Sequence, residues 1–146
     1  MNILLGVGNT LLSDDGAGIF VAESFLKDGW IPYNCGTAPE NFTSIVRREK
    51  PEILLVVDAA RMGLSPGEFR QVPEEKITDV SFGTHQLPLS QLTAYLKEYA
   101  GRIIIIGIEP KTTDFGEELS PEIEEACEKL LEIIKDDPGK VPELRD

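Results

Sequence analysis

Basic residues are scarce in this chain of 146 residues, in which 14 lysines and arginines stand against 26 aspartates and glutamates. The formal net charge is −12. A surface with this excess of negative charge repels phosphate backbones, so we expect no nucleic-acid partner. A partner that is basic, or that carries a metal ion, is compatible with the charge.

Long apolar runs are missing as well. The longest runs, Ile53–Val57 and Ile103–Ile106, have the length of a strand, whereas a membrane-spanning helix needs roughly 20 apolar residues. We therefore expect no membrane insertion. The start of the chain carries no basic region and continues directly into an apolar run, so we also expect no signal peptide and a cytoplasmic location.

Several catalytic and metal-binding motifs do not occur. The chain has no Gly-x-Ser-x-Gly elbow and no His-Glu-x-x-His motif. His85 is the single histidine, which excludes a histidine-rich resident zinc site. Cys35 and Cys127 belong to no Cys-x-x-Cys pattern, and a reducing compartment disfavours a disulfide between them. A Cys35–His85 nucleophile pair stays open.

Strand and helix patterns alternate along the chain. Continuous apolar runs predict buried strands, and apolar residues at helical spacing predict amphipathic helices. The predicted strands cover residues 2–8, 30–35, 53–57, 68–72 and 102–108; the predicted helices cover residues 15–28, 39–48, 88–99 and a segment beginning at Ser120–Pro121.

This alternation predicts a three-layer α/β/α fold. We expect a mostly parallel, twisted sheet of about five strands with helices on both faces. Residues 1–136 would form one α/β domain. Residues 137–146, with a proline and a glycine next to each other and no periodicity, would form a loosely ordered tail.

Chemically active side chains follow the predicted strands. Parallel sheets place ligands beyond the carboxyl ends of their strands, so these side chains should share one rim. Asp14 and Asp15 follow the first strand, and Asp58 ends the third. His85 precedes a helix, while Glu109 and Lys111 follow the last strand and could form a rim ion pair.

The glycine-rich turn after the first strand suggests a dinucleotide site only weakly. Gly6 and Gly8 are followed by Leu11 where the motif has its third glycine. The neighbouring acidic pair would also repel a pyrophosphate.

A receiver-like phosphoacceptor signalling domain is the main non-enzyme alternative. Such domains carry an acidic pair after the first strand and an acceptor aspartate at the end of the third, which Asp14, Asp15 and Asp58 imitate. Thr84 and Lys111 imitate the later hydroxyl and lysine. However, residues 6–13 separate the strand from the acidic pair, and Lys111 follows its proline instead of preceding it.

A metal-contacting hydrolase is the third interpretation. One imidazole and two carboxylates can bind a divalent transition ion. Three such ligands leave open positions on the ion. Open positions suit contact with a metal that arrives on a substrate.

Six stretches, taken in order, resemble the nickel–iron hydrogenase maturation endopeptidases over nearly the whole chain. They are Gly6–Asn9, Asp14–Gly18, Gly36–Asn41, Val57–Ala59 with Met62–Glu68, Thr84–Leu89 and Gly107–Pro110. The Ala-Pro-Glu-Asn and Leu-Pro-Leu sequences within them look most similar to the subgroup that serves formate-hydrogenlyase-type hydrogenases, the hydrogenase 3 type.

The resemblance implies an endopeptidase that removes the C-terminal extension of a nickel-loaded hydrogenase large-subunit precursor. The nickel would be carried by the substrate and would not be permanently bound. The family's metal-contacting and catalytic residues fall on Asp15, Asp58 and His85. We expect Asp14 to hold the loop without touching the metal, and we expect the protein to act as a monomer.

Overall fold

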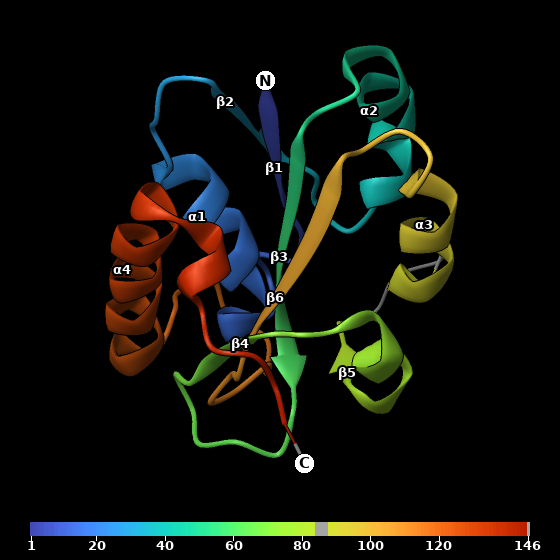
Figure 1. The fold of residues 1–146 in the computed structure, drawn as a ribbon. Helices are drawn as coiled ribbons and strands as arrows, with labels where there is room; N and C mark the ends of the chain where they lie inside the picture. The colour runs from blue at the N-terminus through green and yellow to red at the C-terminus, as the bar shows by residue number, and fades with distance from the viewer. Residues whose placement is uncertain (84–87, 146) are drawn as a thin grey trace.

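The computed structural model describes residues 1–83 and 88–145. Its centre is a sheet in which the strands lie in the order β2-β1-β3-β6-β4 (Figure 1). β2, β1, β3 and β6 are parallel, and β4 pairs antiparallel with β6 at the edge. The strands are β1 (Asn2–Gly6), β2 (Trp30–Asn34), β3 (Ile53–Arg61), β4 (Phe69–Gln71), β5 (Ser81–Phe82) and β6 (Arg102–Ile108).

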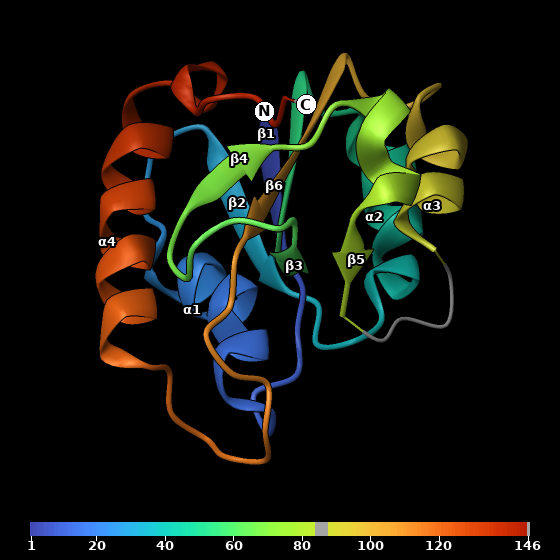
Figure 2. The same ribbon diagram turned by 90° about the horizontal axis from the view of Figure 1, so that it is seen from below.

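Helices cover both faces of this sheet. α1 (Ala17–Ser24) and α4 (Pro121–Asp136) lie together on one face, and α2 (Thr43–Glu49) and α3 (Leu89–Leu96) on the other (Figures 1 and 2). The 3-10 helices are η1 (Ser13–Gly16), η2 (Pro39–Phe42), η3 (Glu74–Asp79) and η4 (Pro138–Lys140). The three-layer fold predicted from the sequence is confirmed. None of the helices within residues 1–83 and 88–145 combines the length and the apolar character needed to cross a membrane.

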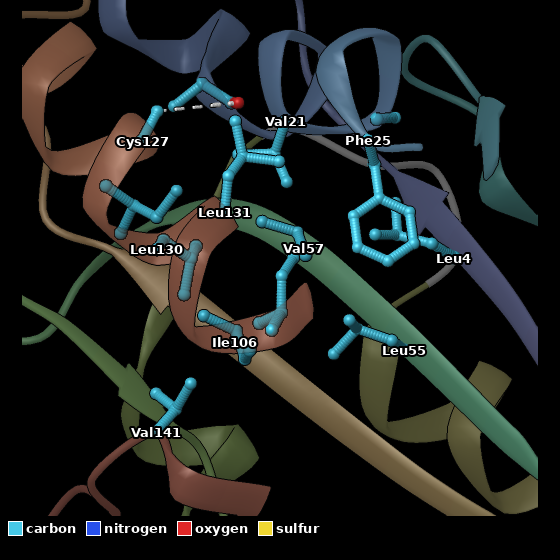
Figure 3. Close-up of a cluster of buried hydrophobic side chains, with 14 of the residues drawn as sticks. Leu4, Val21, Phe25, Leu55, Val57, Ile106, Cys127, Leu130, Leu131 and Val141 are labelled. Carbon is cyan, nitrogen blue, oxygen red and sulfur yellow. Dashed lines mark hydrogen bonds between the residues drawn. The ribbon is translucent and has the colours of Figure 1, made fainter. Parts of the chain in front are cut away.

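The core explains why the apolar runs form strands. Successive side chains of a strand point to opposite faces, so a strand buried on both faces must be apolar throughout. In β3, Leu55 and Val57 pack toward α1 and α4, whereas Leu54 and Val56 pack toward α2 and α3. Figure 3 shows the first of these clusters, in which Leu130 and other α4 side chains meet the sheet. Each fully buried side chain of this size contributes about 1.5–3 kcal/mol.

A close helix–sheet contact fixes the position of α1. A Cβ atom at Gly18 would lie 2.2 Å from the carbonyl oxygen of Val57 and 2.4 Å from that of Val7. Only glycine allows this approach. The start of α1, and η1 before it, are therefore held against the carboxyl ends of β1 and β3.

The third strand is longer than predicted. We expected it to end at Asp58, but β3 continues to Arg61. Its last residues gain partners on two sides, because Ala59 pairs with Ile108 of β6 and Ala60 pairs with Phe82 of β5. The short antiparallel strand β5 was not predicted.

The C-terminal segment makes more contacts than we expected of a loose tail. The Gln71 side-chain amide donates hydrogen bonds to the carbonyl oxygens of Gly139 (3.1 Å) and Val141 (2.7 Å). Val141 is buried in the core cluster that also contains the apolar side chains of α4. The backbone of Leu144 also donates to Gln71 at 2.8 Å. These contacts fasten the described part of the tail along the β4 edge of the sheet.

Candidate active site

A cavity of about 210 Å³ opens beyond the carboxyl ends of β1 and β3. It combines one carboxylate, from Asp15, with one guanidinium, from Arg61. Its other described lining residues are Asn9, Leu12, Thr37, Ala59, Ala60, Ser81, Phe82, Gly83, Pro110 and Thr113. The cavity lies at the rim where the sequence predicted a site.

Asp15 is held in this cavity by the turn that follows β1. The backbone N–H of Asn9 donates to Asp15 Oδ2 at 2.9 Å. The Asn9 side chain folds the turn in addition, because its Oδ1 accepts from the backbone N–H of Leu11 at 2.9 Å. Asp15 is only 6% exposed, and that exposed part faces the cavity. One carboxylate oxygen is thus fixed while the group still meets the cavity.

Gly83 lies directly against the same carboxylate. A Cβ atom at this position would come within 2.5 Å of Asp15 Oδ1. Gly83 follows β5, so the unpredicted pairing of β5 with the end of β3 brings this backbone to Asp15. His85, the third predicted site residue, lies outside the described residues.

Asp58 is placed deeper than we predicted. We expected it on the open rim, but the extension of β3 to Arg61 leaves it inside the sheet, 0% exposed. It faces Gly107 of β6 in the ladder, and η1, which carries Asp15, packs against β3. Asp58 directly precedes Ala59 and Ala60, which line the cavity, but is itself shielded from solvent.

Asp14 has a different role from its neighbour, as we expected. Its Oδ2 accepts from the backbone N–H groups of Lys111 and Thr112, both at 3.0 Å, and from the Ser120 hydroxyl at 2.8 Å. Its Oδ1 accepts from the backbone N–H of Ser120 at 2.7 Å. Asp14 is fully buried and holds the loop between β6 and α4. The two adjacent carboxylates thus differ in role. Asp14 stabilises the loop, and Asp15 lines the cavity.

Glu109 supports the rim in a way that the sequence did not indicate. We expected a rim ion pair with Lys111, and that expectation is wrong, because Lys111 pairs with Glu122 at 3.1 Å. Glu109 is buried, and its Oε1 accepts from the backbone N–H groups of Met62 (2.7 Å) and Leu64 (3.1 Å). It fixes the turn that follows β3.

Cys35 is a poor nucleophile in this setting. Burial, and secondarily the Glu40 carboxylate, raises the pKa of its thiol to about 12. A thiol with that pKa is protonated near neutral pH, whereas the thiolate is the reactive form. The Cys35–His85 pair that the sequence left open is therefore disfavoured.

A preformed metal cluster is not found within residues 1–83 and 88–145, where no three His, Cys, Asp or Glu side chains gather closely enough to hold an ion. Asp15 and Asp58 are the two predicted ligands that the structure describes. Both are carboxylates, whose oxygen atoms can bind a metal ion. They lie in two elements that contact each other, Asp15 in η1 and Asp58 in β3.

Comparison with known proteins identifies the family. The model of the hydrogenase maturation protease family HycI matches residues 25–137. The hydrogenase 3 maturation protease of Escherichia coli K12 is 38% identical over 138 residues, which cover 92% of this chain and 88% of that protein. The chain belongs to the hydrogenase maturation protease family.

Solved structures of family members have the same fold. The solution structure of the endopeptidase HycI from Escherichia coli superposes with a TM-score of 0.88 at 36% identity, covering 99% of this chain and 97% of that one. The crystal structure of a [NiFe] hydrogenase maturation protease HycI from Thermococcus kodakarensis KOD1 gives a TM-score of 0.81 at 33% identity, covering 95% and 92%. These similarities support a hydrogenase maturation protease and do not favour the receiver-like alternative.

Proposed function

We propose that this hydrogenase maturation protease removes the C-terminal extension of a [NiFe]-hydrogenase large-subunit precursor and recognises the nickel that the precursor carries. Asp15, Asp58 and His85 contact the ion in this proposal. The observation that supports it most is the Asp15 carboxylate, whose Oδ2 accepts from the Asn9 backbone and which lines a cavity at the rim of the sheet.

The carboxylates of the site fit an incoming cation, although the Arg61 guanidinium also lines the cavity. A divalent transition ion prefers oxygen and imidazole ligands over an apolar wall, and two carboxylates compensate its charge. Gly83, which touches the Asp15 carboxylate, stands two positions before His85 in the sequence. Asp58 is fully buried in β3, directly before Ala59 and Ala60, which line the cavity, so its contact with the ion requires a local rearrangement at the end of β3.

In this proposal the protein's main contribution is to position the metal ion and a carboxylate next to the peptide bond. A metal ion near a peptide bond polarises its carbonyl group or lowers the pKa of a bound water. Asp15 would orient the ion or accept the proton of the attacking water, because its Oδ2 is fixed by Asn9 and Oδ1 faces the Gly83 backbone. Both uses need a carboxylate at this position.

We also infer a cytoplasmic site of action. Both cysteines are free and buried, which is typical of proteins in reducing compartments.

Cleavage by single-residue variants tests the proposal. Asp15→Asn, Asp58→Asn and His85→Ala should each lower cleavage of a nickel-loaded precursor at least about 100-fold, as expected for a lost acid–base group or ligand. Asp28→Asn, in an exposed loop position between α1 and β2, is the matched control and should cleave normally. Circular dichroism would verify folding, and wild-type rates for a folded Asp15→Asn protein would overturn the proposal.

A further inference from the structure

Two large apolar side chains project into solvent side by side next to the cavity. Phe115 is 83% exposed and Leu11 is 48% exposed. We name this pair the lip, and we propose that it is a docking surface for the polypeptide substrate. It takes an apolar side chain of the precursor that is flanked by basic residues.

Backbone pairing brings the two residues together. Leu12 and Gly116 form a parallel β-bridge, so their preceding residues, Leu11 and Phe115, become lateral neighbours. The Gly116 N–H donates to the Leu11 carbonyl at 2.9 Å, and the Ser13 N–H donates to the Gly116 carbonyl at 2.7 Å. Figure 2 shows the segment before α1 (blue) and the segment before α4 (orange) projecting together from the body of the fold.

The lip is held rigidly although it is exposed. The Ser13 hydroxyl donates to the Asp114 carbonyl at 2.7 Å, and Ser13 adopts a φ of 50°, in the left-handed region. A non-glycine residue in that region costs of order 1 kcal/mol and persists only where its surroundings impose it. Asp14 fastens the loop that carries Phe115 at Thr112 on one side and Ser120 on the other. Phe115 is therefore presented to solvent by a fixed backbone.

The lip continues the wall of the cavity. Leu12 and Thr113 line the cavity that contains Asp15, and they stand one and two positions from Leu11 and Phe115. A polypeptide whose bond is cut beside Asp15 must leave the cavity across its rim. An apolar side chain near the cut would bury Phe115 and Leu11, which adds about 25 cal/mol per Å² of apolar surface.

The charges around the lip define the rest of the partner's chemistry. Asp114, Glu117 and Glu118 are all exposed and border Phe115 in the sequence. In a chain with a net charge of −12, this border disfavours an acidic segment and favours lysines or arginines beside the apolar residue. The inference rests on the proposed function, because the occupant is the precursor itself.

Steady-state cleavage of the nickel-loaded precursor tests the lip. Phe115→Ala and Leu11→Ala should each raise KM about tenfold, as for an interface anchor worth about 1.4 kcal/mol, and leave kcat nearly unchanged. Phe115→Leu should restore most of the lost affinity. Leu26→Ala removes a side chain that is 86% exposed elsewhere on the surface and is the matched control, with an unchanged KM.

The border acids give a second readout. The triple variant Asp114→Asn, Glu117→Gln, Glu118→Gln should raise KM at low salt and weaken the dependence of KM on salt. Wild-type KM values for both Phe115→Ala and Leu11→Ala would overturn the proposal that the lip is a docking surface. The proposed function would still stand, because cleavage would continue. If the wild-type protein leaves the nickel-loaded precursor intact, the proposed function itself is wrong. This outcome differs from the one that contradicts the docking surface alone.

Discussion

The Asp14 carboxylate holds Ser120 by two groups at once. Oδ1 accepts from the Ser120 backbone N–H at 2.7 Å, and Oδ2 accepts from its hydroxyl at 2.8 Å. Ser120 precedes α4, so one acidic residue of η1 anchors the start of α4. The adjacent Asp15 accepts from the backbone N–H of Asn9 and lines the cavity.

Replacing Asp14 should therefore damage the fold. Asp14→Ala removes the acceptor of three backbone N–H groups and one hydroxyl, and we expect the free energy of unfolding to fall by about 3–5 kcal/mol. Urea denaturation measures this loss. Asp114→Asn, on the exposed part of the same loop, should change the free energy of unfolding by less than about 0.5 kcal/mol. An Asp14→Ala protein as stable as wild type would contradict the structural role.

Gly83→Ala should act on catalysis more than on stability. Its methyl group would press on Asp15 Oδ1, which lies 2.5 Å from the added carbon, and would turn the carboxylate away. A displacement of about 1 Å can cost about 100-fold in rate, so we expect a fall of that size in kcat/KM.

The control for Gly83 is Gly29→Ala. Gly29 has a φ of 83° and open space around it, so an alanine there is strained but meets no neighbour. This variant should lose about 1 kcal/mol of stability and keep its kcat/KM. Equal kcat/KM values for the two variants would show that Gly83 has no special relation to Asp15.

Glu109 offers a conservative pair of substitutions. Both of its backbone hydrogen bonds reach the same oxygen, Oε1, so the amide oxygen of Glu109→Gln can still accept them. We expect this variant to lose less than about 1 kcal/mol, whereas Glu109→Ala leaves the Met62 and Leu64 N–H groups without an acceptor and loses about 2–3 kcal/mol. Thermal unfolding of both proteins measures the difference, and equal losses would contradict the proposed contact.

The buried thiols predict a loss of stability at alkaline pH. Burial raises the pKa of both Cys35 and Cys127 from 9.0 to about 12. A raised pKa in the folded state favours folding below the unfolded value, and this contribution is lost as pH rises from about 9 toward 12. The free energy of unfolding should therefore decline over that window. Cys35→Ala with Cys127→Ala should decline less steeply, and an identical slope would contradict the assignment.

The sheet could be predicted because its strands are distinctive. Ile53–Val57 and Ile103–Ile106 are continuous apolar runs, and only a strand buried on both faces requires this pattern. The end of β3 could not be predicted in the same way. Its pairing with β5 joins Ala60 to Phe82 across a segment that contains β4 and η3, and neither local propensity nor periodicity encodes such a partner.

The position of the cavity that Asp15 lines could be predicted from the sequence as far as the rim of the sheet. The position of Asp15 after the first strand followed from the rule that ligands bind at the carboxyl ends of strands. The burial of Asp58 depended on the unexpected length of β3. The role of Glu109 depended on backbone N–H groups more than 40 positions away, at Met62 and Leu64, which side-chain patterns do not reveal.

Nickel dependence is the most direct test of the account. Purified protein should be incubated in parallel with the nickel-loaded and the nickel-free form of the same large-subunit precursor, and release of the C-terminal extension should be followed over time. The account predicts that only the loaded precursor is cut. Equal cleavage of both forms would contradict it, because Asp15, Asp58 and His85 would then act without the ion that they are proposed to contact.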